Sequence, residues 1–273
     1  MPDRYAVVGH PIAHSKSPAI HAAFARSTGQ DLVYERLLAP LDGFRATVER
    51  FAAEGGLGLN VTIPFKREAF EVASAISERA RLAGAVNTLK RVGDAWHADN
   101  TDGAGLVRDV VANLGVDLRG REIAVLGAGG AVRGILKPLL DAGVASVTVT
   151  NRTMAKAHEI AAQFARYGRV EAVDPRALRP HAVVVNATSL GMGGAAVDDF
   201  PFDGAVVAPG AFAIDLIYSD AETPFMRWAR AHGAGRATDG LGMLVEQAAE
   251  SFALWRGVRP DTRPVFAMMR PGA

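Results

Sequence analysis

The stretch Ile123-Ala124-Val125-Leu126-Gly127-Ala128-Gly129-Gly130 decides the fold class of this chain. Four apolar residues, typical of a buried strand, run into a glycine-rich turn, and the residues that follow predict a helix. In that context the backbone amides of the turn and the helix N-terminus can hold a pyrophosphate. The third position of the usual dinucleotide fingerprint is Val132 in place of glycine or alanine, although Gly134 lies two residues later. The stretch therefore predicts a dinucleotide-binding turn, and a glycine turn without a ligand is the alternative interpretation.

More apolar strands follow this one along the chain. They are expected over 146–150, 182–186 and 213–217, with helical segments between them. Uninterrupted apolar strands belong to a parallel sheet that is buried on both faces. Asp174-Pro175 and Thr223-Pro224 each join a capping residue to a proline suited to the first helical turn, so each predicts a helix start.

The N-terminal part also alternates strands and helices. Strands are expected over 5–9, 31–38, 57–63, 85–90 and 95–98, and helices from Ser17, over 41–53 and over 65–75. Apolar residues from Leu41 to Phe51 recur at helical spacing, and the last two strands can pair as a hairpin across Gly93-Asp94. Ser17 is expected to cap its helix, with Pro18 at the first helical position. The whole pattern predicts an α/β protein, and the loop at Asn100–Gly103 indicates a domain boundary.

Composition limits the function classes. A length of 273 residues favours two medium domains, and 49% hydrophobic with 22% charged residues is ordinary for a soluble globular protein. A formal net charge of +1 gives no basic excess for nucleic-acid binding, and the absence of cysteine excludes disulfides, thiolate zinc sites and cysteine nucleophiles. The N-terminus lacks a secretory pattern, and the apolar segment Met243–Trp255 is too short to span a bilayer, so we expect a cytoplasmic protein without a membrane partner.

Residues after the second strand of the nucleotide-binding unit indicate the cofactor. About 20 residues beyond the glycine turn, where NAD-binding proteins carry an acidic residue, this chain has Asn151-Arg152-Thr153, with Lys156 close behind. A guanidinium at Arg152 can pair with a 2′-phosphate, which a carboxylate would repel. The sequence therefore favours NADP over NAD, and a solvated arginine is the alternative.

A lysine at a turn is the candidate for proton chemistry. Lys66 ends the stretch Asn60-Val61-Thr62-Ile63-Pro64-Phe65-Lys66, and Asp102 is its candidate partner, because an ammonium and a carboxylate within hydrogen-bond reach orient each other. Burial would lower the lysine pKa and the carboxylate would raise it, and the sequence leaves the balance open. Uncharged hydrogen-bonding residues suited to a polyhydroxylated ligand stand at nearby strand ends: Asn60, Thr62, Asn87 and Thr101.

The first loop carries hydroxyls beside a helix start. Ser15 and Ser17, within His14–Ser17, can donate to a carboxylate, whereas simple capping by Ser17 is the competing interpretation. A serine hydrolase is disfavoured because the chain has no Gly-x-Ser-x-Gly elbow. His10, His14 and His21 lack carboxylates at metal-site spacing, so we expect no metal site.

Taken in order along the chain, these motifs closely resemble those of shikimate dehydrogenases. The shared segments are Val8–Pro18, Asn60–Lys66, Gly84–Thr88, Asn100–Gly103, Gly127–Gly130, Asn151–Thr153, Asn186–Met192, Asp215–Tyr218 and Gly240–Gln247. The resemblance covers nearly the whole chain. It implies an N-terminal α/β domain for the substrate over 1–102 plus 241–273, a Rossmann-type doubly wound NADP domain over 103–240, and a C-terminal helix that returns to the first domain.

The resemblance also implies roles for individual residues in the reversible NADPH-dependent reduction of 3-dehydroshikimate to shikimate. Lys66 is the acid/base, paired with Asp102. Substrate-binding residues are Ser15, Ser17, Thr62, Asn87, Asp102, Tyr218 and Gln247. Cofactor-binding residues are Gly127, Ala128, Gly129, Gly130, Ala131, Asn151, Arg152, Thr153, Met154, Ala155, Lys156, Thr188, Ser189, Leu216, Gly240 and Met243.

Two departures from the family pattern are visible, and two rival functions stay open. Ala22 replaces a frequent asparagine, and Ser219-Asp220 replaces the usual Asn-Pro after Tyr218. One rival is a quinate/shikimate dehydrogenase with relaxed cofactor use, although members of that subtype usually carry an acidic residue near Arg152. The other rival is a sensor that binds shikimate-pathway ligands without turnover. A monomer and a homodimer are equally compatible with the sequence.

Overall fold

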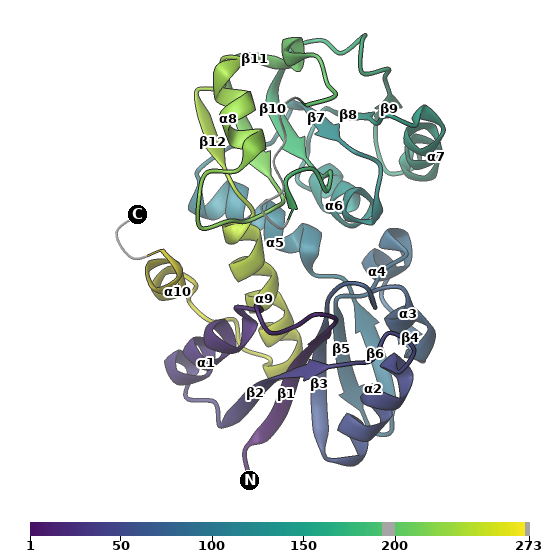
Figure 1. The fold of residues 1–273 in the computed structure, drawn as a ribbon, viewed down its shortest axis with the longest axis vertical. Helices are drawn as coiled ribbons and strands as arrows, with labels where there is room; N and C mark the ends of the chain where they lie inside the picture. Colours follow the sequence, from purple (N-terminus) through teal and green to yellow (C-terminus); the bar gives the residue numbers. More distant parts are fainter. Residues whose placement is uncertain (193–199, 271–273) are drawn as a thin grey trace. The chain divides into compact units, whose positions relative to one another are not determined.

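The chain forms two compact units in a computed structural model that describes residues 1–192 and 200–270 (Figure 1). The first unit contains Met1–Leu106 and Leu244–Ala273, and the second contains Val107–Met243. The divisions fall inside two helices, α5 (Asp102–Arg108) and α9 (Leu241–Arg256), rather than in loops. Each unit has its own sheet and its own core.

The first unit is built on a mixed six-stranded sheet of order β2-β1-β3-β5-β6-β4. Its strands are β1 (Asp3–Gly9), β2 (Leu32–Leu38), β3 (Gly56–Val61), β4 (Ala75–Ile76), β5 (Thr88–Val92) and β6 (Ala95–Asp99). β1 is parallel to β2 and β3, whereas β5 is antiparallel to β3 and β6. Because β5 runs against its neighbours, its beginning lies at the same edge as the ends of β3 and β6.

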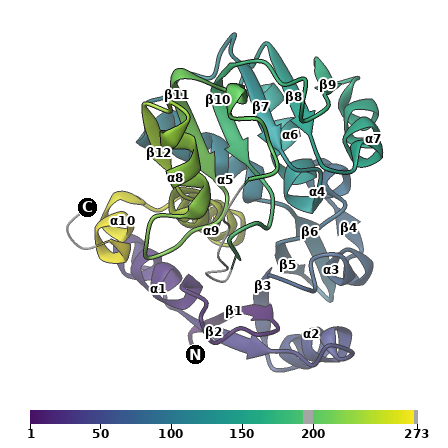
Figure 2. The same cartoon turned by 45° about the horizontal axis from the view of Figure 1, so that its top comes forward.

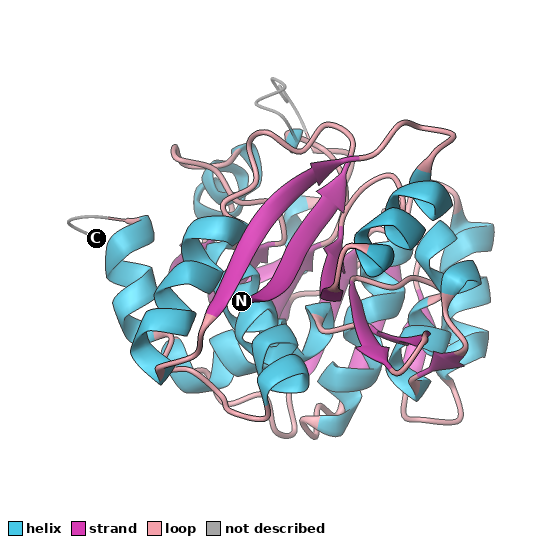
Figure 3. Ribbon diagram, turned by 90° about the horizontal axis from the view of Figure 1, so that it is seen from below, coloured by secondary structure: helices cyan, strands magenta, loops and turns pink. Residues whose placement is uncertain are grey.

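Helices lie on both sides of this first sheet (Figure 3). They are α1 (Ser17–Thr28), α2 (Phe44–Ala53), α3 (Glu68–Val72), α4 (Glu78–Ala83) and α10 (Arg263–Met269), with the first-unit part of α9. Phe44, Phe51 and Phe65 are fully buried with Leu59 in the core of the unit. Leu41, expected inside the second helix, is 63% exposed and precedes it, because α2 begins only at Phe44.

The predicted hairpin is confirmed. β5 and β6 pair in register from Thr88 with Asp99 to Val92 with Ala95. Gly93 lies between them with a φ of 60°, a left-handed conformation that glycine adopts without steric cost. The hairpin brings the residues before β5 and after β6 to one edge of the sheet.

The second unit is built on a six-stranded parallel sheet of order β12-β11-β10-β7-β8-β9 (Figure 2). Its strands are β7 (Glu122–Leu126), β8 (Ser146–Thr150), β9 (Val170–Ala172), β10 (His181–Asn186), β11 (Val207–Asp215) and β12 (Arg236–Thr238). Its longer helices are α6 (Gly130–Asp141), α7 (Met154–Phe164) and α8 (Pro224–Ala231). A parallel sheet whose order reverses beside its first strand is doubly wound, so the predicted fold class is confirmed.

Of the two helix starts expected in the second unit, the structure has one. Thr223 caps α8 by accepting a hydrogen bond from the amide of Met226 at 3.2 Å, as expected. The expected helix start at Asp174-Pro175 is wrong. The Asp174 side chain accepts from the amide of Arg176 at 2.9 Å and forms a closed turn that no helix continues.

The helix expected near the C-terminus is α9, and it extends from Leu241 to Arg256. Residues 244–256 of α9 belong to the first unit, so the C-terminal segment returns to the first sheet as predicted. Phe252 is fully buried there, and the indole of Trp255 donates to the carbonyl of Leu89 at 3.0 Å. In the described part of the chain, none of the helices is both long and apolar enough to cross a membrane.

Candidate active site

Lys66 and Asp102 form a close ion pair at the edge of the first sheet. Lys66 Nζ lies 2.6 Å from Asp102 Oδ2, and 30% and 15% of the two side chains are exposed. Lys66 stands in the turn after β3, where its carbonyl accepts from the amide of Val86 at 2.8 Å, and Asp102 is the first residue of α5. The structure therefore brings together the two residues that the sequence paired.

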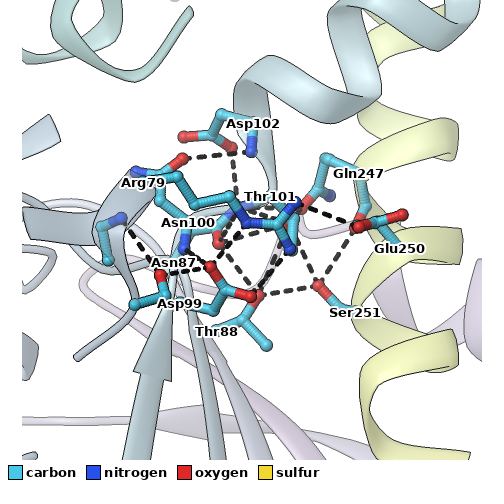
Figure 4. Close-up of polar contacts among 12 residues, drawn as sticks. Arg79, Asn87, Thr88, Asp99, Asn100, Thr101, Asp102, Gln247, Glu250 and Ser251 are labelled. Atoms are coloured by element: carbon cyan, nitrogen blue, oxygen red, sulfur yellow. Dashed lines mark hydrogen bonds and ion pairs between the residues drawn. The ribbon is translucent and has the colours of Figure 1, made fainter. Parts of the chain in front are cut away.

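Asn87 holds the second oxygen of this carboxylate (Figure 4). Its amide nitrogen donates to Asp102 Oδ1 at 2.7 Å and to Gln247 Oε1 at 3.2 Å. Its amide oxygen accepts from the backbone of Thr101 at 2.9 Å. Both carboxylate oxygens of Asp102 are thus engaged by donors, so the carboxylate is held in one orientation beside the ammonium.

A second carboxylate, Asp99, braces the loop that carries Asp102. Arg79 binds both oxygens of Asp99, at 2.6 and 2.7 Å, and the amide of Asn100 donates to Asp99 Oδ1 at 2.8 Å. Burial opposes the charge on Asp99, but the hydrogen bonds and positive charge of Arg79 outweigh it, so the pKa of this carboxyl lies below its usual value. The Asn100 side chain then accepts from the amide of Asp102 at 3.1 Å. Arg79 and Asp99 were not identified from the sequence, because isolated charges on a helix and a strand resemble ordinary surface residues.

The loop with Ser15 and Ser17 lies beside the lysine turn. A Cβ on Gly9 would come within 2.5 Å of a Thr62 methyl, so only glycine lets the ends of β1 and β3 approach this closely. Ser15 is fixed through its carbonyl, which accepts from Arg36 at 2.6 and 3.1 Å. Ser17 is the first residue of α1 and does not cap it. Lys16 is at the cap position, and Ser15 Oγ accepts from the amide of Ser17 at 3.3 Å.

The glycine turn of the second unit has the geometry of a tight turn with an open outer side. Gly127 has a φ of 114°, and a Cβ there would lie 3.0 Å from the carbonyl oxygen of Ala187, so the position requires glycine. A Cβ on Gly129 or Gly130 would meet nothing within 4 Å. α6 begins at Gly130 without a side-chain cap, so no cap side chain competes with an anion for its first amides. Val132, the departure from the fingerprint, is completely buried and serves the core.

The candidate cofactor residues after β8 form an exposed turn next to this loop. The amide of Gly127 donates to the carbonyl of Thr150 at 2.8 Å, so the ends of β7 and β8 are adjacent. The Asn151 side chain donates to the carbonyl of Thr153 at 3.0 Å and shapes the turn in which Arg152 is exposed. Arg152 and Lys156 therefore add positive charge beside the open turn. Ala128 is buried, Ala131, Thr153, Ala155 and Lys156 are exposed, and Met154 is half-buried.

A buried carboxylate organises the remaining candidate cofactor residues. Asp215, at the end of β11, accepts from Asn186 at 2.9 Å and from Thr223 at 2.7 Å, and burial raises the pKa of Asp215. Asn186 in turn accepts from the Thr188 hydroxyl at 2.7 Å. A Cβ on Gly240 would lie 2.4 Å from the carbonyl of Leu216, so these two segments touch.

The other predicted binding residues of the second unit lie within three positions of Thr188, Leu216 or Gly240 in the sequence. Ser189 is exposed, Met243 is half-buried in α9, and Tyr218 is 37% exposed after β11. Ser219-Asp220, which departs from the family pattern after Tyr218, lies in a turn where the amide of Ser219 donates to the Asp239 side chain at 3.1 Å.

Ala22, the other departure from the family pattern, is half-buried in α1.

A doubly wound sheet with an open glycine turn, in a chain that also holds a lysine–aspartate pair, fits the class of nicotinamide-nucleotide-dependent oxidoreductases. Three family models match the chain: the shikimate dehydrogenase substrate binding domain over residues 7–89, shikimate / quinate 5-dehydrogenase over 109–190, and the shikimate 5′-dehydrogenase C-terminal domain over 240–265. A relative from Thioalkalivibrio sulfidiphilus, named shikimate dehydrogenase (NADP(+)), is 57% identical over 272 residues, which cover 98% of each chain. The chain belongs to the shikimate dehydrogenase family, as its motifs predicted.

Solved structures share the fold, and a shikimate dehydrogenase is among them. An Ael1 enzyme from Pseudomonas putida is 48% identical, with a TM-score of 0.91 and 97% of each chain covered. Shikimate 5-dehydrogenase from Thermus thermophilus, solved in complex with NADP(H) and shikimate, is 35% identical, with a TM-score of 0.85 and 96% of each chain covered.

Proposed function

We propose that this chain catalyses the reversible NADPH-dependent reduction of 3-dehydroshikimate to shikimate, a step of chorismate and aromatic amino acid biosynthesis. The single observation that carries the residue assignment is the Lys66–Asp102 pair, 2.6 Å apart at a sheet edge lined by hydroxyl and amide side chains. The relative at 57% identity carries the name of an NADP(+)-dependent enzyme, and this supports both the reaction class and the cofactor.

Lys66 acts as the acid in the proposed reduction. When bound, NADPH supplies the hydride that adds to the ring carbonyl carbon. The Lys66 ammonium donates a proton to the carbonyl oxygen as negative charge develops there, and takes it back in the reverse direction. Because 30% of the Lys66 side chain is exposed, solvent can restore the proton. Asp102 keeps the ammonium oriented, and Asn87 fixes Asp102 from its other oxygen.

Side chains around this pair are proposed to bind the rest of the substrate. Ser15 and Ser17 hold the carboxylate, with Arg36 fixing Ser15 and adding positive charge nearby. Thr62, Asn87, Asp102 and Gln247 bind the ring oxygens, together with Tyr218. Asn87, Thr101 and Gln247 are already joined by hydrogen bonds between 2.9 and 3.3 Å, so the site is organised without a ligand.

The second unit is proposed to hold NADP. The open space over Gly129 and Gly130 fits a pyrophosphate against the first amides of α6, and the exposed Arg152 fits a 2′-phosphate. Thr188, Ser189, Leu216, Gly240 and Met243 are proposed to face the nicotinamide. The proposed domain assignment follows: residues 1–102 plus 241–273 bind substrate, and residues 103–240 bind NADP.

Steady-state kinetics with shikimate and quinate, each against NADP and NAD, test the proposal. We expect shikimate with NADP to have the highest kcat/KM. Comparable kcat/KM values for NADP and NAD, with turnover of quinate, would indicate the relaxed quinate/shikimate enzyme instead. Tight binding of shikimate and NADP without any change in nicotinamide absorbance would indicate a sensor. The family relatives favour neither rival.

The proposed partners are small molecules only. With a net charge of +1 the chain has no general attraction for nucleic acid, and we propose that it works in the cytoplasm as a monomer or a homodimer. Light scattering of the purified protein would measure its mass and decide between these two states.

A further inference from the structure

A chain of polar groups, buried except for the half-buried Tyr34, runs behind the candidate active site and ends on Asn87. Its members are Tyr34 on β2, Asn60 on β3, Ser251 on α9 and Thr88 on β5, and we call them the buried polar chain. Asn60 is 6% exposed, and Thr88 and Ser251 are completely buried. All four residues belong to the first unit, and Figure 4 shows Thr88 and Ser251 turned toward each other, with their hydroxyls 2.7 Å apart.

The hydrogen bonds of the buried polar chain run in one direction. The Tyr34 hydroxyl donates to Asn60 Oδ1 at 2.7 Å, and the amide nitrogen of Asn60 faces the carbonyl of Asn87 at 3.2 Å, which can only accept. That nitrogen donates to Ser251 Oγ at 3.0 Å and to Thr88 Oγ1 at 3.3 Å. Burial raises the pKa of Tyr34 well above its usual value, with an opposing hydrogen bond from Ser17, so the phenol remains a donor.

Thr88 passes this orientation on to Asn87. Its hydroxyl, which accepts from Asn60, donates to Asn87 Oδ1 at 2.9 Å. The backbone amide of Thr101 donates to the same oxygen at 2.9 Å. A flipped Asn87 would turn its oxygen toward Asp102 and its nitrogen toward an N–H group, and both contacts would be repulsive. The amide nitrogen of Asn87 is therefore held on Asp102 Oδ1.

We propose that Thr88 is a positioning residue for the proposed proton transfer: its buried hydroxyl orients Asn87, and through it Asp102 and Lys66, without touching the substrate. This inference rests on the proposed function. Tyr34, Asn60 and Ser251 support Thr88 by fixing which of its contacts are donors. A misplacement of a catalytic group by about 1 Å can cost about 100-fold in rate, so a small rotation of Asn87 has a measurable effect.

The test compares Thr88→Val with Thr88→Ser. Valine keeps the shape of threonine without the hydroxyl, whereas serine keeps the hydroxyl. We expect Thr88→Val to lower kcat about 10-fold with a smaller change in KM, and to shift the pH at which kcat falls, because the Lys66–Asp102 pair is no longer held in place. Thr88→Ser should retain kcat and the pH profile.

Thr47→Val is the matched control. Thr47 is a buried threonine of the same unit whose hydroxyl donates to the carbonyl of Gly43 at 2.9 Å, away from the active site. It should lose stability without changing kcat or the pH profile. If Thr88→Val behaves in the same way, Thr88 is only structural and the inference is overturned.

A second variant keeps the test decisive if Thr88→Val does not fold. Tyr34→Phe preserves the ring that stacks on His21 at 4.1 Å but removes the hydroxyl that donates to Asn60. We expect a smaller loss of kcat, about 3-fold, with a pH shift in the same direction. Tyr5→Phe removes a hydroxyl that accepts a hydrogen bond from Arg256, and it should change neither kcat nor its pH profile. An unchanged pH profile in Tyr34→Phe would also overturn the inference.

Wild-type turnover of 3-dehydroshikimate tests the proposed function separately. A crystal structure of Thr88→Val tests the inference whatever the substrate is. We expect the separation of Lys66 Nζ and Asp102 Oδ2 to exceed the present 2.6 Å, with Asn87 rotated. An unchanged separation and an unrotated Asn87 would contradict the inference even if the wild-type enzyme is fully active.

Discussion

Asp99 and Asp102 stand close together in the chain, yet their environments assign them different roles. Arg79 binds both oxygens of Asp99, and Ser77 donates to it at 2.6 Å. That carboxylate is saturated by donors that hold the loop. Asp102 contacts the ammonium of Lys66 and an amide, and 15% of its side chain is exposed. Asp102 is therefore the carboxylate that remains accessible to a ligand.

The exposed Arg152 gives a prediction about cofactor choice. If its guanidinium pairs with the 2′-phosphate, Arg152→Ala should raise KM for NADPH by about 10-fold or more, the scale of a charge-assisted hydrogen bond, and leave KM for NADH nearly unchanged. Steady-state kinetics with both nucleotides measures the ratio. Arg176→Ala removes another exposed arginine of the same unit and should leave both constants unchanged. Equal effects on NADPH and NADH would contradict the assigned role.

His21 gives a prediction about stability and pH. It is completely buried, stacked on Tyr34, and burial lowers the pKa of His21 to about 3, with a weaker opposing contribution from Asn60. Since the unfolded chain binds a proton near pH 6.5 and the folded one does not, stability falls as the pH falls from 6.5 toward 3. The loss from this group is about 2 kcal/mol at pH 5.

Denaturant unfolding at pH 7 and pH 5 measures this loss. His21→Phe, which keeps an aromatic ring, should lose less stability between the two pH values than the wild type. His97→Gln replaces an exposed histidine in β6 and should leave the difference unchanged. Identical pH dependence in His21→Phe and the wild type would show that His21 is not the responsible group.

At the scale of elements, two glycines of the turn between β7 and α6 are expected to be needed for different reasons: Gly127 for folding and Gly129 for nucleotide binding. Gly127→Ala forces a side chain into a φ of 114° and against Ala187, so it should lower thermal stability and NADPH affinity together. Gly129→Ala meets nothing within 4 Å, so the protein should keep its stability while the methyl group obstructs the pyrophosphate. Thermal denaturation and fluorescence titration with NADPH measure both quantities. Wild-type affinity in Gly129→Ala would contradict the placement of the pyrophosphate.

Elements with long apolar patterns were predicted well, and short ones were not. β7 and β8 are buried along nearly their whole length, so after their first residues their sequences are continuously apolar or β-branched. β9 and β12 have three residues each and lie at the edges of the sheet, where burial imposes no clear pattern. The Asp174 side chain accepts from the amide of Arg176, and the chain forms a turn there instead of a helix. The same local sequence is compatible with both structures, so the tertiary context decides between them.

Part of the candidate site was also beyond prediction from the sequence. Lys66, Asp102 and Asn87 stood out because they are polar residues at strand ends. Thr88 and Ser251 did not, because Thr88 is an ordinary strand residue and Ser251 interrupts an apolar helix that looks like core. Their hydroxyls bond to each other across 163 positions of the chain, a contact that only the folded structure reveals.

At the scale of the whole molecule, the chain divides its chemistry between two units with different sheets. The mixed sheet of the first unit places three strand ends at one edge, so residues as distant as Lys66, Asp102 and Gln247 meet there. The parallel sheet of the second unit places the glycine turn beside Arg152 at the ends of β7 and β8. The family relatives share both parts over 98% of the chain, which supports one enzyme with a proton site and a nucleotide site.

NADPH oxidation with 3-dehydroshikimate is the direct test of the central claim, that Lys66 is the acid/base of the proposed reduction. Lys66→Ala should lower kcat by about 100-fold or more with a modest change in KM, because acid/base assistance is lost while substrate contacts remain. Arg67→Ala, which removes the exposed cation next in the chain, should keep wild-type turnover. Near-wild-type kcat in a folded Lys66→Ala enzyme would contradict the claim.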